Sequence, residues 1–184
     1  MKIFITGGCG YKGSILIPKL LDKGYLVTSI DTEWFGNYLK PHENLELIKC
    51  DIREINNISL AGFDTIIHLA NIANDPAVEL NPSMSWEINV LAGQQLIEKA
   101  KEANIKNFLF ASSGSVYGVK EEEKVTEELS LVPISTYNKT KMIAERVLLS
   151  YQSQLKIHSI RPATVCGLSP RMRLDVAVNL LTFQ

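Results

Sequence analysis

Short apolar runs alternate with helical patterns along this chain. Six of the runs predict buried β-strands, at residues 2–5, 25–30, 45–49, 63–69, 107–111 and 155–160. Apolar positions at helical spacing predict the main helices over 14–23, 83–103, 135–151 and 175–183. Strand and helix in alternation predict an α/β fold with a doubly wound parallel sheet of the Rossmann type, which forms one domain over residues 1–184.

The first strand runs into a turn that has glycines at positions 7, 10 and 13. Gly7 can take a tight turn, Gly10 lets the backbone approach a pyrophosphate, and Gly13 lets the helix pack closely on the strand. Backbone N–H groups at the start of that helix, around Tyr11 and Lys12, would face the phosphates. The turn therefore predicts a dinucleotide-binding site.

Asp31 ends the second predicted strand, about 20 positions beyond the glycines, where a carboxylate commonly holds a ribose 2′-hydroxyl. A simple turn aspartate is the alternative interpretation. Because a carboxylate there would repel a 2′-phosphate, we predict NAD and not NADP as the cofactor.

Composition excludes several classes of function. The 184 residues are 46% hydrophobic and 21% charged with a net charge of −1, so no nucleic-acid or membrane partner is expected. No apolar run approaches the roughly 18 residues of a membrane span, and no signal-peptide pattern opens the chain. Three dispersed cysteines predict free thiols in a reducing cytoplasm, and three scattered histidines predict no metal site. Of these, His68 is predicted to be a buried core residue.

Tyr137 and Lys141 are four positions apart on a predicted helix and therefore share one face. A neighbouring ammonium, helped by a positively charged nicotinamide, would lower the pKa of Tyr137 and make it a usable base. Ser113, just after the fifth strand, could donate a hydrogen bond to the same substrate oxygen. A tyrosine and lysine at this spacing are often accidental, but the preceding glycine turn favours a catalytic pair.

Taken together, these motifs resemble the extended short-chain dehydrogenase/reductase family, and within it the NAD-dependent nucleotide-sugar epimerases and dehydratases. The matching motifs occur in the expected order across the chain: residues 6–13, Asp31, Asp51-Ile52, His68-Leu69-Ala70, Asn89-Val90, residues 112–118, Tyr137 with Lys141, and Arg161-Pro162.

The resemblance implies roles for further residues. It implies that Asp51 and Ile52 lie near the adenine, and that Asn89 braces the site as part of the cofactor-binding set. The implied neighbours of the nicotinamide are Leu69, Ala70, Asn71, Pro162 and Ala163. The implied substrate contacts are Ser113, Ser115, Tyr137 and Thr164. Asn71 stands where the resembling enzymes commonly have a small residue, and Thr164 where many have asparagine.

The resemblance also narrows the reaction. Related 4,6-dehydratases carry an Asp-Glu pair just after the catalytic hydroxyl, whereas this chain has Gly114-Ser115 there. We therefore expect a nucleotide-sugar 4-epimerase that works by transient oxidation. The alternatives are a non-catalytic NAD-binding or dimerisation module, a nucleotide-sugar dehydratase and an NAD-dependent carbonyl reductase.

Enzymes of this family continue for about a hundred residues or more, so the C-terminal substrate domain is expected to be largely absent from this sequence. The resemblance further implies a homodimer formed by the helices at 83–103 and 135–151. The apolar residues that could form its seam are Leu91, Leu96, Ile143, Val147 and Leu148, although the same residues could pack on the sheet instead.

Overall fold

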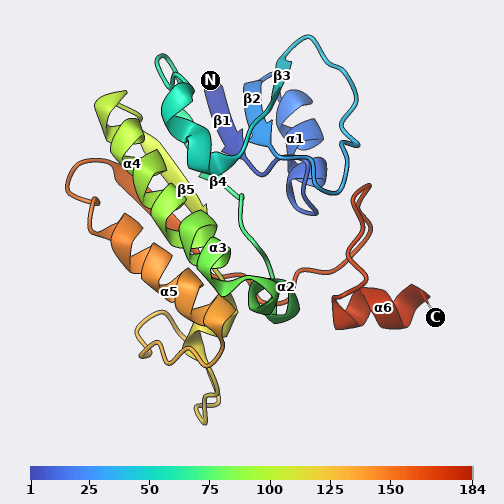
Figure 1. The fold of residues 1–184 in the computed structure, drawn as a ribbon, viewed down its shortest axis with the longest axis vertical. Coiled ribbons are helices and arrows are strands. Elements are labelled where there is room, and N and C mark those ends of the chain that lie inside the picture. The colour runs from blue at the N-terminus through green and yellow to red at the C-terminus, as the bar shows by residue number, and fades with distance from the viewer. Residues whose placement is uncertain (184) are drawn as a thin grey trace.

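The fold is built on a parallel sheet, seen here in a computed structural model that describes residues 1–183 (Figure 1). In this part of the chain six strands pair in the order β3-β2-β1-β4-β5-β6. Their bounds are β1 (Lys2–Thr6), β2 (Leu26–Asp31), β3 (Leu45–Lys49), β4 (Thr65–His68), β5 (Asn107–Ala111) and β6 (Lys156–Ile160). The strand order reverses at β1, which confirms the predicted doubly wound sheet and places a crevice beyond the ends of β1 and β4.

The four predicted helices all form, with shifts at their ends. They correspond to α1 (Gly13–Leu21), α3 (Pro82–Trp86) continuing into α4 (Ala92–Glu102), α5 (Thr136–Leu149) and α6 (Ala177–Phe183). Between α3 and α4 the helix widens into a π-helical segment, η2 (Glu87–Leu91), which the sequence pattern did not reveal. The sequence also missed α2 (Asp75–Leu80) and two short 3₁₀ helices, η1 (Ile52–Asn57) and η3 (Gly114–Tyr117).

Capping side chains explain where two of these helices begin. The Asn81 side chain accepts a hydrogen bond from the backbone N–H of Met84 at 3.0 Å, just before Pro82 opens α3. Ser135 caps α5 in the same way, accepting from the N–H of Asn138 at 3.2 Å. The second cap fixes the first turn of α5, which carries Tyr137.

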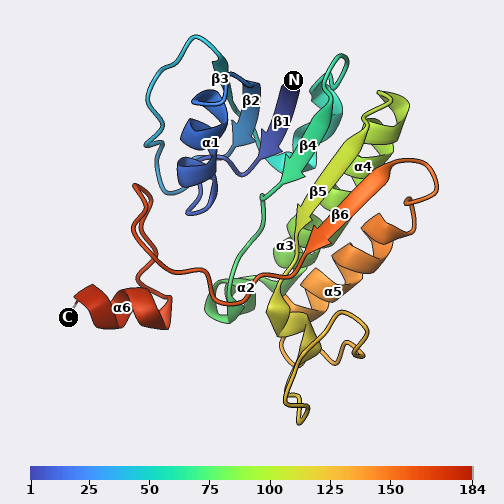
Figure 2. The same cartoon turned by 180° about the vertical axis from the view of Figure 1, so that it is seen from behind.

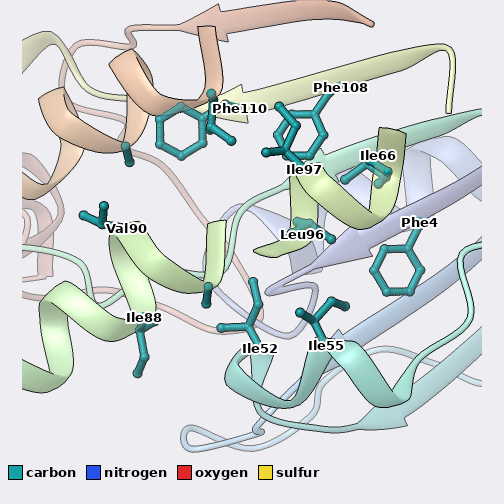
Figure 3. Close-up of a cluster of buried hydrophobic side chains, with 14 of the residues drawn as sticks. Phe4, Ile52, Ile55, Ile66, Ile88, Val90, Leu96, Ile97, Phe108 and Phe110 are labelled. Atoms are coloured by element: carbon teal, nitrogen blue, oxygen red, sulfur yellow. The ribbon is translucent and has the colours of Figure 1, made fainter. Parts of the chain in front are cut away.

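The sheet buries apolar side chains on both of its faces. Phe4 points into the larger cluster, whereas its neighbours Ile3 and Ile5 point into a smaller cluster beneath α1. In the larger cluster, Leu96 and Ile97 of α4 meet side chains of the strands (Figure 3). Both cartoon views show α4 and α5 side by side against β5 and β6 (Figures 1 and 2).

The residues predicted for a dimer seam separate into two groups. Leu96 and Leu148 are buried in the larger cluster, so they pack on the sheet and cannot form the seam. Leu91 is 53% exposed, and Ile143 and Val147 are half-buried. Ile143 also packs against the edge of the larger cluster, so Leu91 is the most exposed of the three.

Several other expectations concern the surface and the thiols. Residues 121–128, an acidic stretch, are all exposed. None of the helices within residues 1–183 is both long and apolar enough to span a membrane. The thiols of Cys9, Cys50 and Cys166 are free. Over the same described residues, His, Cys, Asp and Glu side chains form no group of three that could hold a metal ion.

Candidate functional site

A cleft of about 430 Å³ lies at the carboxyl ends of the parallel strands. Most of the residues predicted for the cofactor line this cleft: Gly7, Gly10, Tyr11, Lys12, Gly13, Asp31, Asp51, Ile52, Leu69, Ala70, Asn71, Tyr137 and Lys141. Ligands of doubly wound sheets bind at this edge. Residues from distant parts of the sequence thus line a single cleft.

The glycine turn is packed too tightly for side chains. Gly7 has a φ of +77°, and a Cβ built on it would lie 2.5 Å from the backbone nitrogen of Ala70. A Cβ on Gly13 would lie 2.4 Å from the carbonyl oxygen of Gly8, so Gly13 packs against the turn itself. Gly8 was missed from the sequence, although its Cβ would collide with Ser29 Oγ at 2.1 Å. Gly7 and Gly13 require glycine because backbone atoms lie too close, whereas at Gly8 a larger residue would have to displace the Ser29 and Ile17 side chains.

The start of α1 fits a pyrophosphate. The backbone N–H groups of Tyr11, Lys12 and Gly13 donate no hydrogen bond to any group within residues 1–183. A Cβ on Gly10 would meet only the carbonyl oxygen of Gly7, at 3.3 Å, so the approach to the backbone is open. Free donors at a helix N-terminus, with the Lys12 ammonium in the same wall, are suited to bind an anionic diphosphate.

Asp31 has a structural task that the sequence did not show. One carboxylate oxygen accepts from the backbone N–H of Cys9 at 3.0 Å, and the other accepts from Glu33 N–H at 2.8 Å. The carboxylate thereby ties the end of β2 to the glycine turn, and each oxygen keeps a lone pair for a ribose hydroxyl. Burial and the charges of Asp31 and Glu33 raise the pKa of the Cys9 thiol to about 12, so this thiol stays protonated.

The predicted adenine end contains a local ion pair. The Asp51 side chain accepts from the backbone N–H of Arg53 at 2.9 Å and from its Nη2 at 2.8 Å. These hydrogen bonds lower the pKa of Asp51. Trp34 and Phe35 also line this end of the cleft, and the sequence analysis did not single them out.

Lys141 is fixed at the opposite end of the cleft. Its Nζ donates to the carbonyl oxygen of Ala111 at 2.7 Å and lies 4.8 Å from the centre of the Phe110 ring. Burial lowers the pKa of Lys141 to about 7, and the charge of Lys12 adds to the effect. A lysine held in this way can carry or release a proton near neutral pH.

Tyr137 lies one turn before Lys141 on α5, as predicted. Burial raises its pKa, while the charge of Arg173 and the nearby Ser113 hydroxyl act in the opposite direction. The sequence predicted that Lys141 lowers this pKa. In the structure the neighbouring charge that lowers it is the guanidinium of Arg173, because Lys141 is directed to the Ala111 carbonyl.

Ser113 caps η3 and is paired with a second serine. Its Oγ lies 2.8 Å from Ser115 Oγ and accepts from Ser115 N–H at 3.2 Å. Pro162 packs on the same segment, since its carbonyl accepts from Gly114 N–H at 2.8 Å. Neither serine lines the main cleft, although the Ser113 hydroxyl lies near enough to Tyr137 to lower its pKa.

Three further predicted residues lie away from the cleft wall. Pro162 and Ala163 pack beside Gly114, and Thr164 is exposed. The structure does not bring these residues to the wall of the cofactor cleft, to which the segment after β6 contributes only from Arg171 onward.

Asn89 connects two segments of the chain through its side-chain hydrogen bonds. Fully buried on η2, it accepts from the N–H of Ile72 at 2.8 Å and donates to the carbonyl of Ile72 at 3.1 Å. The same amide nitrogen donates to Thr140 Oγ1 on α5 at 3.1 Å. Asn89 therefore joins the segment after β4 to α5 and does not itself line the cleft.

The segment after β6 contributes residues that sequence reasoning missed. Arg171, Arg173 and Asp175 line the cleft, and Arg173 is ion-paired with Asp175. The segment is attached to the glycine turn, since the Tyr11 hydroxyl donates to the carbonyl of Gly167 at 2.6 Å. The two closely spaced arginines of this segment, which follows the last strand, were the available signal.

Comparison with known proteins identifies the family. Residues 3–179 match the model of the NAD dependent epimerase/dehydratase family. The chain belongs to this family. It is 29% identical over 171 residues to the UDP-glucose 4-epimerase of Corynebacterium glutamicum, covering 91% of this chain and 52% of that protein. It is 31% identical over 185 residues to UDP-glucuronic acid decarboxylase 1 of Xenopus tropicalis, covering 95% and 43%.

The solved structures agree with this family. MoeE5, in complex with UDP-glucuronic acid and NAD, has a TM-score of 0.86 at 29% identity, covering 98% of this chain and 60% of that one. NAD is the cofactor of the family, which confirms the cofactor prediction at that level. The chain spans about half the length of the two curated relatives, and their reactions differ, so family membership indicates a class of enzyme and not one activity.

Proposed function

We propose that this chain is the cofactor-binding part of an NAD-dependent nucleotide-sugar 4-epimerase. The observation that carries the proposal is that one cleft joins the glycine turn to Tyr137 and Lys141. A dinucleotide seated on the turn would extend along this cleft toward the tyrosine, which is the arrangement that reversible oxidation of a sugar hydroxyl needs.

The proposal assigns a role to the main groups that line the cleft. The free N–H groups at the start of α1 and the Lys12 ammonium bind the pyrophosphate, and Asp31 binds the adenosine ribose. NAD, when bound, supplies the acceptor and later the donor of a hydride. Tyr137 removes the proton from the 4-hydroxyl of the sugar and returns it after the sugar has turned over.

The groups around Tyr137 support its role as a base. Ser113 donates a hydrogen bond to the reacting oxygen and keeps the sugar within reach of the tyrosine. The Arg173 guanidinium favours the phenolate. Lys141, held by the Ala111 carbonyl, is placed to pass protons because its pKa of about 7 allows both states at neutral pH.

Epimerisation is preferred to dehydration because no acid follows the catalytic serine. Gly114 and Ser115 occupy that place, and a Cβ on Gly114 would already lie 3.2 Å from the Pro162 carbonyl oxygen. Elimination of water from the sugar needs an acid and a base there, whereas a 4-epimerase needs neither.

A homodimer and a cytoplasmic location belong to the same proposal. Leu91 is 53% exposed, and Ile143 and Val147 are half-buried, so each leaves apolar surface uncovered that a second copy could bury. Sedimentation of the purified chain tests the dimer, and a monomer at all concentrations would remove it.

The function is tested by incubating the purified, NAD-loaded chain with UDP- and GDP-hexoses and identifying the products. We expect one hexose to be converted to its 4-epimer, and Tyr137→Phe to reduce the rate about 10²–10⁴-fold while NAD stays bound. Tyr151→Phe is the matched control, because this tyrosine lies just after the same helix and donates to Glu98 on the surface at 3.0 Å.

Other products would identify the alternatives. A 4-keto-6-deoxy sugar would indicate a dehydratase, and stoichiometric consumption of NADH would indicate a carbonyl reductase. Bound NAD without conversion of any sugar would indicate a binding module.

A further inference from the structure

The chain between β6 and α6 is attached around the cofactor cleft. Arg171, Arg173 and Asp175 of this segment line the cleft. In the cartoon views the chain leaves β6, rises toward α1 and then returns to α6 (Figures 1 and 2). Contacts with other parts of the protein hold residues 167–175 at three places.

The first place is the start of α1, beside the glycine turn. Ser169 is buried there, and its Oγ donates to the carbonyl oxygen of Tyr11 at 2.9 Å and lies 3.0 Å from Ser14 Oγ. The Tyr11 hydroxyl donates to the Gly167 carbonyl at 2.6 Å and accepts from Asn179 Nδ2 at 3.1 Å. Hydrogen bonds therefore fix this end of the segment at the predicted pyrophosphate site.

The second place is the loop after β2, at the predicted adenine end of the cleft. The guanidinium carbon of Arg171 lies 3.9 Å from the centre of the Phe35 ring, which is a cation–π contact. Both residues line the cleft, and Phe35 is also 63% exposed. A residue that lines the cleft and is largely exposed lies at its rim, so this contact is made at the rim.

The third place is the turn before α2, in the segment after β4. The Asn74 side chain donates to the carboxylate of Asp175, which is also paired with Arg173. All three residues line the cleft. In the sheet, β2 and β4 lie on opposite sides of β1. Residues 167–175 are thus attached to segments from both sides of the crevice beyond β1 and bridge it.

A segment attached on both sides of a crevice covers what lies inside. We propose that residues 167–175 form a lid over the bound dinucleotide, and that the lid must release Phe35 before the cofactor can enter or leave. The inference rests on NAD binding in the proposed function, and it adds control of cofactor exchange at the same site.

A lid has a kinetic signature that a cofactor-binding residue lacks. The contacts of the lid are made between groups of the protein itself, so the closed form prevails both before and after binding. Loosening the lid then raises the association and dissociation rate constants by the same factor and leaves Kd unchanged. Loss of a residue that only binds the cofactor raises the dissociation rate constant alone and weakens Kd.

The test is stopped-flow fluorescence with NADH as the probe, on the 184-residue chain after any co-purified cofactor has been removed. Phe35→Leu keeps apolar bulk without the ring, and Arg171→Gln keeps most of the side chain without the charge. We expect each to raise both rate constants about three- to thirtyfold, because either change breaks the cation–π contact. For the same reason, the double variant should be no faster than either single variant.

Two further variants separate the lid from direct binding. Ser169 does not line the cleft, so Ser169→Ala loosens the lid at α1 without removing a group that could touch the cofactor. It should also raise both rate constants together. Lys2→Gln is the matched control: it removes a cation–π contact with Phe63, at 4.8 Å, and neither residue lines the cleft. Its rate constants should not change.

Three outcomes would overturn the inference. Unchanged rate constants in Phe35→Leu and Arg171→Gln would show that the contact does not limit exchange. A weaker Kd with an unchanged association rate constant would show that the two residues bind the cofactor directly. Additive effects in the double variant would show that they act separately. If the unmodified chain bound no NADH, the proposed function itself would fail, and this inference with it.

Discussion

The two ends of the cleft are built in different ways. At the glycine turn, the functional groups are backbone atoms of one short segment, and their positions follow from glycine spacing after a strand. At the other end, called the reacting end because the proposed reaction would take place there, Tyr137 and Lys141 of α5 meet Arg173 from the segment after β6, with Ser113 nearby. Only the tertiary fold brings these three segments together. The difference shows that a site made from backbone is encoded locally, whereas a site made from side chains depends on distant contacts.

Two ion pairs show the same difference between local and long-range contacts. At the turn end, Arg53 is 41% exposed and bonds mainly to Asp51, two residues away. One turn beyond Lys141 on α5, the Glu145 side chain is 1% exposed and is paired with Arg161, which also donates to the hydroxyl of Tyr117 at 2.7 Å. The second pair connects the end of β6 with α5 and η3. We therefore expect it to contribute far more to the stability of the fold.

The largest effect is expected from breaking the buried pair. Arg161→Ala leaves the Glu145 carboxylate buried without its partner, and we expect a loss of about 3–5 kcal/mol in the free energy of unfolding. Arg53→Ala, the matched change at the exposed pair, should cost about 1 kcal/mol or less. Urea unfolding of both variants measures this, and equal losses would contradict the contrast between the ends.

The glycine turn can be tested with two glycines of similar φ. Gly7→Ala should lower the free energy of unfolding by about 3 kcal/mol or more, because left-handed strain adds to the clash with Ala70. Gly24 has a φ of +75° with nothing within 4 Å of a Cβ, so Gly24→Ala should cost only about 1–2 kcal/mol. A Gly7→Ala variant no less stable than Gly24→Ala would show that the turn is not tightly packed.

His68 links the two ends through the core. It is buried, its Nδ1 lies 2.7 Å from Thr6 Oγ1, and it stacks on Phe110 beneath Lys141. Burial, and then the charge of Lys141, lowers its pKa to about 3. Below about pH 6.5, His68 is protonated in the unfolded chain but stays neutral in the native state. The free energy of unfolding therefore falls as the pH falls from about 6.5 toward 3, by about 1.4 kcal/mol per pH unit.

This pH effect is isolated by His68→Gln. Chemical unfolding at pH 7 and pH 5.5 should show a smaller loss for the variant than for the unmodified chain. The same loss in both proteins would mean that His68 accepts its proton without unfolding.

The smallest effect is expected from Arg173. Arg173→Gln removes the charge that lowers the pKa of Tyr137, so that pKa should rise further. If Tyr137 acts as the base, the acidic limb of the rate profile moves to higher pH, and Arg173→Lys restores it. An unchanged pH–rate profile in Arg173→Gln would show that Arg173 does not lower the pKa of Tyr137.

The sequence predicted the sheet, the main helices and the glycine turn because each depends on a local pattern. Asp31 was placed correctly at the end of its strand, but its bond to the Cys9 N–H could not be foreseen because it closes a 22-residue loop. Arg173 was missed because its position depends on even more distant contacts. Its segment is bonded to Tyr11 and Ser14, more than 150 residues earlier. Leu96 and Leu148 were ambiguous because a helix pattern shows which residues share a face, but not what covers it.

The central claim is that the cleft oxidises a sugar hydroxyl and then reduces the same carbon. The most direct test uses the nucleotide hexose that the NAD-loaded chain converts, labelled with deuterium at carbon 4, and locates the label in the product by NMR. We predict that the 4-epimer keeps the deuterium at carbon 4, because the hydride leaves and returns without exchange with water. Replacement of the label by solvent hydrogen, or the absence of any converted hexose, would contradict the account.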